Sequence, residues 1–280
     1  MMGPKVNAVP SRRRHGALTL GSLLVALVIV MAAGAPQIAP YSPYDLDVTK
    51  MLQGPSVAHW LGTDEVGRDV LTRTIYAARI SIEVALIAVS VGLAGGTLIG
   101  LLAAYFGGVV DMVLMRLMEL LFSFPAILLA VVLMASLGTS ILNAMVAIGI
   151  IFIPGFARLA RASTMDVLRQ QYVEAARSIG MGDARIIFRE ILPNILAPLL
   201  VEAAVAFAYA ILLESALNFL GLGAQPPEAS WGNMINTGRG FMAQAPWLGI
   251  VPGAALFFCV LGFNLLGDGM RDYLDPHMKE

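Results

Sequence analysis

Long apolar runs separated by polar segments are the feature that most constrains how this chain can fold. Six of them approach the roughly 20 residues that a helix needs to cross a bilayer: Ala17–Ala35, Val84–Phe106, Leu120–Leu137, Ile141–Ala157, Leu199–Leu220 and Trp247–Leu266. Hydrophobic residues make up 58% of the chain and charged residues 13%, against about a half and about a quarter in soluble domains. The sequence therefore predicts an all-α, polytopic membrane protein with six transmembrane helices.

Two prolines interrupt the expected third and fourth spans. Pro125 falls in the third run and Pro154 in the fourth, and Arg116 and Glu119 lie just before the third run. The limits of these two spans are therefore the least defined. Because neighbouring helices can supply partners for the backbone groups that a proline leaves free, both prolines are compatible with membrane-spanning helices.

A polar segment, Arg158–Asn194, separates the fourth and fifth spans and carries six arginines. With six spans, both termini lie on the same side of the membrane as this segment. Most lysines and arginines then fall on that side, which the positive-inside rule identifies as the cytoplasm. The consecutive arginines Arg12–Arg14 are interpreted as part of this topology signal and not as a nucleic-acid contact.

The predicted organisation follows from the spans. A cytoplasmic tail covers residues 1–16, the first transmembrane helix residues 17–35, an extracytoplasmic loop with an interfacial helix (Asp64–Arg79) residues 36–79, and a core domain residues 80–280. The core domain holds the other five spans and a cytoplasmic loop over about 158–198. A cleavable signal peptide is the alternative for the first span, but a run of 19 residues exceeds the about 7 to 15 residues of a signal core.

The polar segment has the pattern of two short amphipathic helices. In the first, apolar residues recur at the helical period opposite a polar face; they are Leu168, Tyr172, Ala175, Ala176 and Ile179. Gly180 is expected to end this helix, since glycine is common at helix C-termini. Asp183 is expected to cap a second helix over Ala184–Ile191, and Pro193 to close the unit. Such a helix pair between two membrane spans indicates a partner protein.

Motifs for catalysis and cofactor binding are missing from the sequence. A phosphate-binding P-loop needs G-x-x-x-x-G-K-[ST], and none of the lysines follows a glycine. The single cysteine lies in the sixth span, and the three histidines are too scattered to predict a metal site. The chain is therefore predicted to be a non-enzymatic membrane subunit that binds no metal or cofactor itself.

The polar segment resembles the EAA loop of the membrane subunits of binding-protein-dependent ABC importers. The resemblance is carried by Glu174, Ala175 and Ala176, followed by Gly180, Leu192 and Pro193 at the family's spacing. One position departs from the pattern, because the isoleucine expected two residues before the Leu-Pro pair falls on Glu190, with Ile191 beside it. Further stretches are similar to the C-type permease of dipeptide, oligopeptide and nickel importers: HWLGTDEVGRDVLTR from residue 59, NFLGLGAQPPEASWGNM from residue 218 and FNLLGDGMRDYLDP from residue 263.

This resemblance implies the type I ABC importer permease fold and a set of partners. Permeases of that family work with a second related permease, two cytoplasmic ATPase subunits and an extracytoplasmic substrate-binding protein, in the lipid of the bacterial cytoplasmic (inner) membrane. ATP-Mg is then used by the ATPase subunits. The residues implied to couple the permease to the ATPases are Glu174, Ala175, Ala176, Gly180, Met181, Leu192 and Pro193.

Polar side chains inside the spans are the candidates for the translocation pathway. Glu214 and Asn218 lie one turn apart in the fifth span, and ionisable groups at membrane depth are functional by default. Glu202, Asn143 and Asn264 are further candidates. An alternative role for Glu214 is a hydrogen bond to the second permease.

Two other patterns have both a functional and a packing interpretation. The glycines Gly92, Gly95, Gly96 and Gly100 in the second span favour close helix packing over a pore lining. The loop from residue 221 to residue 246 is expected to be a gate or a docking surface for the binding protein. Its tryptophan Trp231, and Trp247 just after it, have interfacial anchoring as the alternative.

Two other functional classes are considered. A secondary, ion-coupled transporter would show internal repeats, and none is evident. A membrane scaffold without transport activity would not need the polar segment. The solute stays open among dipeptides, oligopeptides, nickel chelates and glutathione, because the binding protein sets most of the selectivity in such importers.

Overall fold

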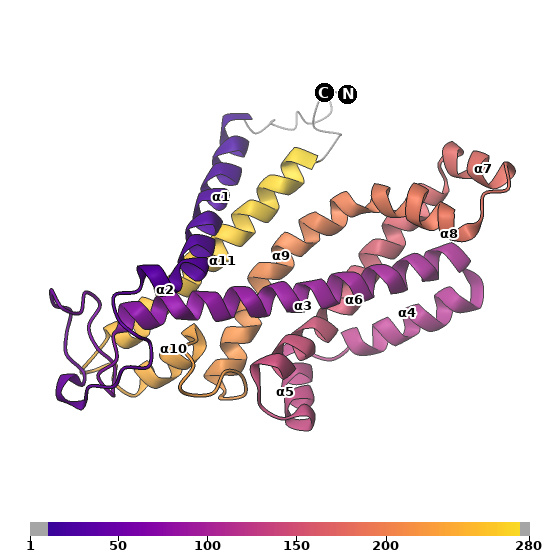
Figure 1. The fold of residues 1–280 in the computed structure, drawn as a ribbon. Coiled ribbons are helices and arrows are strands. Elements are labelled where there is room, and N and C mark those ends of the chain that lie inside the picture. Colours follow the sequence, from indigo (N-terminus) through magenta and orange to yellow (C-terminus); the bar gives the residue numbers. More distant parts are fainter. Residues whose placement is uncertain (1–10, 275–280) are drawn as a thin grey trace, which may run out of the picture.

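The computed structural model describes residues 11–274, with side chains for residues 16–273, and its regular elements are helices (Figure 1). In chain order they are α1 Ser11–Ala33, α2 Ala35–Ile38, η1 Val48–Lys50, α3 Val70–Phe106, α4 Gly108–Phe122, α5 Ala126–Leu137, α6 Ile141–Leu168, α7 Gln171–Ser178, α8 Asp183–Arg185, η2 Ile186–Ile191, α9 Leu192–Phe219, α10 Trp231–Arg239 and α11 Trp247–Leu274. η1 is a 3-10 turn and η2 a π-helical turn. Most of the tail expected over residues 1–16, the side chains of Arg12–Arg14, and residues 275–280 lie outside the described part.

Long apolar helices confirm the all-α membrane fold. Within residues 11–274, five stretches are long and apolar enough to cross a membrane, and α4 with α5, bent by 92°, adds a sixth if this pair forms one span. The third span expected over Leu120–Leu137 is therefore wrong as a single helix, because the chain breaks into α4 and α5 there. Pro125 is the N-cap of α5, and its ring and missing N–H prevent α4 from continuing through it.

The helices that hold the other spans are longer than the apolar runs that predicted them. α3 begins at Val70, after Asp69 accepts a hydrogen bond from the Thr72 amide at 2.8 Å, and it runs unbroken to Phe106. An interfacial helix over Asp64–Arg79 is therefore wrong as a separate element, because its second half begins the spanning helix. α6 also continues into the polar segment, as far as residue 168. Helix ends depend on caps and backbone hydrogen bonds, not on where an apolar run stops.

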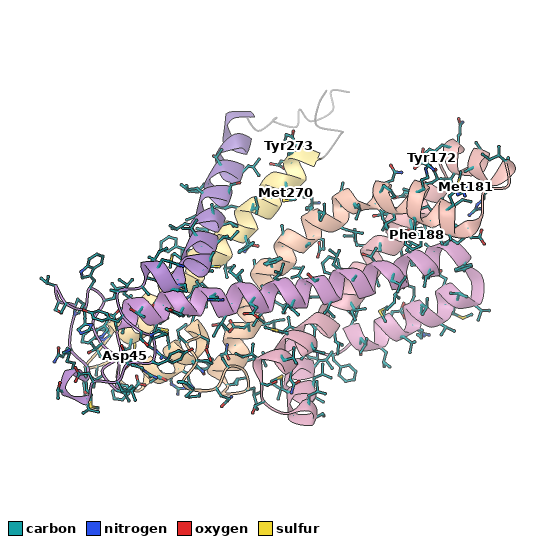
Figure 2. All side chains as sticks on the ribbon, viewed as in Figure 1. Asp45, Tyr172, Met181, Phe188, Met270 and Tyr273 are labelled. Carbon is teal, nitrogen blue, oxygen red and sulfur yellow. The ribbon has the colours of Figure 1, made fainter. Side chains whose placement is uncertain are left out.

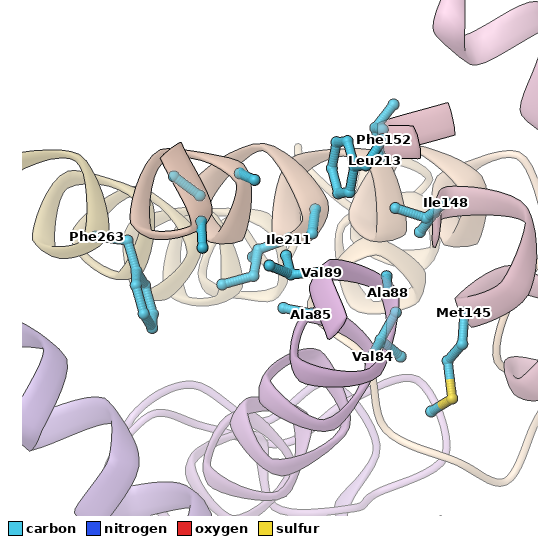
Figure 3. Close-up of a cluster of buried hydrophobic side chains, with 14 of the residues drawn as sticks. Val84, Ala85, Ala88, Val89, Met145, Ile148, Phe152, Ile211, Leu213 and Phe263 are labelled. Atoms are coloured by element: carbon cyan, nitrogen blue, oxygen red, sulfur yellow. The ribbon is translucent and has the colours of Figure 1, made fainter. Parts of the chain in front are cut away.

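Close contact between α3 and α6 forms the centre of the fold. A Cβ atom at Gly96 would lie 2.5 Å from the Cβ atom of Phe156, and one at Gly100 would meet the Ala157 carbonyl oxygen. Small residues let helix backbones approach each other in membranes, so the packing interpretation of this glycine pattern is confirmed. Apolar side chains of α3, α6, α9 and α11 fill the space beside the contact (Figure 3).

The bundle separates two ends of the molecule (Figure 1). α1 and α11 pack together, and a Cβ atom at Gly262 of α11 would lie 2.8 Å from Leu24 Cβ of α1. The segment of residues 39–69, α2 and α10 lie at the N-terminal end of α3, which we call the cap end. α7 and α8 lie at the C-terminal end of α3, which we call the α7 end.

Candidate functional site

The short helix α7 has two different faces. It buries Val173 and Ala176, the latter only 6% exposed, against the protein. Tyr172, Ala175 and Ile179 are exposed, Ile179 to 79%. The expected single apolar face is therefore wrong, because η2 packs against α7 and provides a second surface that the sequence of the helix alone does not reveal.

Gly180 ends α7, as expected. Its φ of +78° is left-handed, a conformation in which glycine lacks the strain of other residues. The Gly180 amide donates to the Arg177 carbonyl at 3.0 Å, and the Met181 amide donates to the Ala176 carbonyl at 3.1 Å. This pair of bonds is the Schellman motif of a helix C-terminus. No heavy atom of the described chain lies within 4 Å of a Cβ placed at Gly180, so the backbone conformation alone favours glycine.

The turn between α7 and α8 is tied to the end of α3. Gly182 is the N-cap of α8, so the capping role expected for Asp183 is wrong. Instead, the Tyr105 hydroxyl donates a hydrogen bond of 2.6 Å to Asp183 Oδ1. The Arg177 guanidinium lies 5.4 Å from the centre of the Tyr105 ring. Tyr105 therefore contacts residues on both sides of the turn.

Pro193 does not close the polar segment. η2 continues into α9, and Pro193 lies in the first turn of α9. Proline needs no N–H partner in a first turn, and the wider π turn before it leaves room for the ring. Ile186 and Ile191 are buried and Leu192 is half-buried, whereas Phe188 is 66% exposed.

Apolar side chains gather on the surface of the α7 end, where Figure 2 labels three of them. We define the α7 patch as Tyr172, Ala175, Ile179, Met181 and Phe188, which are exposed or half-buried. Glu174 is exposed beside them. An exposed apolar cluster with a polar rim is typical of a protein-protein contact.

Glu214 and Asn218 are buried and hydrogen-bonded within the chain. Glu214 is 2% exposed, and Ser81 Oγ of α3 donates to its Oε2 at 3.1 Å. Asn218 Nδ2 donates to the other carboxylate oxygen, and Asn218 Oδ1 accepts from the Ala224 amide. The two side chains thus join α3, α9 and the loop after α9.

Two of the three tryptophans at the cap end, Trp231 and Trp247, also form internal contacts. Trp231 is 1% exposed, and its Nε1 donates to the Thr74 carbonyl at 3.1 Å. Trp247 Nε1 donates to the Thr63 carbonyl at 3.2 Å. Interfacial anchoring by Trp231 is therefore wrong, because its ring is covered by α3 and neighbouring segments. A gate or docking role for the loop of residues 221–246 stays a prediction.

Charged side chains order the segment of residues 39–69. His59 Nδ1 and Asp69 Oδ1 are 2.9 Å apart, and both residues are buried. Asp64 accepts from Arg68 Nε at 2.6 Å and lies 3.5 Å from Arg73 Nε. All five residues belong to the stretch 59–73 that carries the C-type resemblance. This stretch therefore builds a fixed structure at the cap end.

A cavity of about 430 Å³ lies where α4, α5, α6 and α9 meet. Its walls include Phe122, Phe124, Pro154 and Tyr209, and Glu202 is the charged residue among the described residues that line it. The bend after α4 and the proline within α6 both border it. The sequence offered Glu202 as a candidate, but no pattern in it brings the aromatic residues of three helices together.

The other ionisable side chains of the described part include an ion pair but no metal site. Among residues 11–274, no three His, Cys, Asp or Glu side chains lie close enough together to hold a metal ion. Arg161 of α6 donates two hydrogen bonds to Asp111 of α4, at 2.5 and 2.6 Å. Cys259 is buried in α11.

A helical bundle with five or six membrane crossings, a cavity between them and a contact patch at one end has the architecture of a transporter subunit. Two solved structures have this fold. An amino acid ABC transporter solved with histidines matches with a TM-score of 0.55 and 18% identity, over 70% of this chain and 92% of that chain. The inward-facing MetNI methionine ABC transporter matches with a TM-score of 0.54 and 17% identity, over 70% and 90%. The fold is therefore that of an ABC importer permease.

Sequence comparison identifies the family. Residues 96–280 match the model of the binding-protein-dependent transport system inner membrane component, and the chain belongs to this family. A dipeptide transport system permease of Alkalihalophilus pseudofirmus is 42% identical over 278 residues, 99% of this chain and 91% of that protein. Glutathione transport system permeases of Pectobacterium atrosepticum and of Escherichia coli O6:K15:H31 are 44% and 45% identical, over 95% and 96% of this chain and 89% and 88% of theirs.

Family membership defines the general role of the chain. It is the multi-pass, inner-membrane permease subunit of an ABC importer, and it works with ATPase and binding-protein partners. ATP is used by the partner ATPases, and this subunit is non-catalytic. An ion-coupled secondary transporter and a scaffold without transport activity are excluded.

Proposed function

We propose that this permease forms half of an import pathway for short peptides, in the class of dipeptides and glutathione. The supporting observation is that relatives named for dipeptide and for glutathione transport match nearly the whole chain, at 42% and 45% identity. Both kinds of solute are small zwitterions with a free α-ammonium group. Oligopeptides and nickel chelates, which the C-type resemblance also implies, are less well supported.

Uptake by the complete importer tests this substrate class. The complex is reconstituted in vesicles with its second permease, its ATPases and its binding protein, and labelled dipeptide, glutathione and nickel chelate are offered separately. We expect ATP-dependent accumulation of dipeptide or glutathione. Accumulation of the nickel chelate alone would contradict the proposal.

Coupling to the ATPases is proposed to occur through the α7 patch. Two ATPase subunits and a second, related permease complete the complex, and one ATPase receives α7 in a surface groove, a common mode of helix recognition. Ala175 and Met181 contribute directly because they lie on the patch, and Glu174 lies at its rim. Ala176 acts from beneath by holding α7 in place. Gly180, Leu192 and Pro193 set the directions of the helices on either side.

Glu214 and Asn218 are proposed to shape the pathway wall. Their hydrogen bonds to Ser81 and Ala224 support a role in fixing α9 against α3 and the following loop. Direct contact with the solute by these two residues has less support, because both are nearly inaccessible in this chain.

The α7 end and both termini are proposed to face the cytoplasm, and the cap end to face outward. Val57 at the cap end is 96% exposed, and Ala184 of α8 is exposed at the α7 end outside the α7 patch, so each is a suitable labelling position. In a Cys259→Ser background, we expect a membrane-impermeant maleimide to label Val57→Cys in spheroplasts. Ala184→Cys should react only in inside-out vesicles. The reverse pattern would contradict this orientation.

A further inference from the structure

Glu202 places a carboxylate in the cavity between α4, α5, α6 and α9. The residue is exposed and lies in the spanning helix α9. Within residues 16–273 its carboxylate has no hydrogen bond or ion pair, in contrast to Glu214 on the same helix. Ionisable groups at membrane depth are expensive and normally have a partner, so Glu202 requires one from outside the described chain.

The cavity walls around this carboxylate favour the binding of a cation. Glu202, Val205 and Tyr209 follow one another at the i, i+3, i+7 spacing of one helix face, and all three line the cavity. Phe124 and Tyr209 present exposed rings there. A negative charge beside aromatic faces attracts an ammonium ion through an ion pair and through cation–π contacts.

The size of the space favours a small solute over a single partner side chain. A volume of about 430 Å³ falls within the range of about 300–1,000 Å³ found for small-molecule sites. A lysine or arginine of the second permease would pair with Glu202 without needing a hollow of this size. The cavity also borders the bend between α4 and α5, and Pro154 of α6 is one of its lining residues.

We propose that Glu202 binds the α-ammonium group of the solute as it passes through the membrane, with Tyr209 and Phe124 lining the space for the rest of the molecule. This inference rests on the proposed function, because dipeptides and glutathione share this ammonium group. The site gives the permease a selectivity step of its own, beyond that of the binding protein.

The test measures solute binding to the complete permease–ATPase complex in nanodiscs, without nucleotide and without binding protein. L-alanyl-L-alanine and its N-acetyl derivative are the probes, and ligand-observed NMR reports weak binding. We expect the acetylated probe to bind about tenfold more weakly to the wild-type complex, as loss of a charge-assisted contact implies. Glu202→Gln should weaken binding of the free dipeptide by about tenfold and remove the difference between the probes.

Two further variants complete the design. Glu202→Asp keeps the charge and should keep the discrimination between the probes. Glu83→Gln removes an exposed carboxylate from α3 that does not line the cavity, and it should behave as wild type. Size-exclusion chromatography of every variant shows whether the second permease remains bound in the complex.

The possible outcomes distinguish failure of the proposed Glu202 site from failure of the proposed substrate class. A Glu202→Gln complex that still discriminates between the probes overturns the site alone. Loss of the second permease from this variant, with unchanged dipeptide affinity, also overturns it and identifies a subunit contact instead. A wild-type complex that neither binds nor imports the dipeptide or glutathione overturns the proposed substrate class together with the site.

Discussion

Replacing Ala175 with aspartate is expected to abolish uptake while the complex still inserts into the membrane. Ala175 is exposed on the α7 patch, so the substitution leaves α7 folded but adds a carboxylate to an apolar contact. An uncompensated charge in a buried interface costs about 3–5 kcal/mol, which corresponds to at least about 100-fold weaker docking. Uptake and substrate-stimulated ATP hydrolysis of the reconstituted complex should therefore be lost together.

Three companion variants separate docking from folding. Ala184→Asp places the same side chain on an exposed residue of α8 outside the patch, and it should transport normally. Ala176→Asp places it under α7, so we expect increased protease sensitivity of this helix as well as lost uptake. Gly180→Val should reduce coupling through strain of about 1–3 kcal/mol at its left-handed backbone. Wild-type transport by Ala175→Asp would mean that α7 is not the coupling element.

Replacing Gly100 with alanine is expected to destabilise the whole bundle, whereas the same change at Gly95 is tolerated. A Cβ atom at Gly100 would lie 2.8 Å from the Arg161 backbone nitrogen and 2.9 Å from Ala160 Cβ, and backbone atoms of α6 cannot move aside. At Gly95 the nearest atom is the flexible Cδ1 of Ile153, at 3.3 Å. Overpacking of a close contact costs about 1–3 kcal/mol, and the loss at Gly100 should reach the upper part of this range.

Thermal unfolding of the purified complex measures this difference. Fluorescence-detected size-exclusion chromatography after heating should give a lower midpoint for Gly100→Ala and little change for Gly95→Ala. Equal unfolding midpoints for the two variants would mean that α3 and α6 can move apart without loss of stability. That result would contradict the close contact between them.

The spans were predictable because apolar length alone determines whether a helix can cross a membrane. Their limits were not, since α3 and α6 continue through polar residues as long as backbone hydrogen bonding continues. The bend after α4 was also missed, although Pro125 marked its place. Proline is tolerated in many membrane helices, and the sequence does not show which proline will end one.

In the candidate site too, features that depend on neighbouring residues in the chain were predictable, and features that depend on contacts between distant residues were not. Gly180 was assigned correctly because a helix C-terminus is a local feature. The inward position of Ala176 depends on η2, and the environment of Glu214 depends on Ser81, 133 residues away in the chain. Helical periodicity describes one helix at a time, so it carries no information about such partners.

The length of α3 gives the molecule a stiff mechanical link between its two ends (Figure 1). Its 37 residues span about 55 Å at about 1.5 Å per residue, well beyond a hydrocarbon core of about 30 Å. One end is held by Tyr105 to Asp183 beside α7, and the other by Thr74 to Trp231 at the cap end. Because an unbroken helix resists stretching and compression along its axis, α3 connects the α7 end rigidly to the cap end. A displacement of α7 along this axis is therefore expected to reach the cap end without any change in the helix itself.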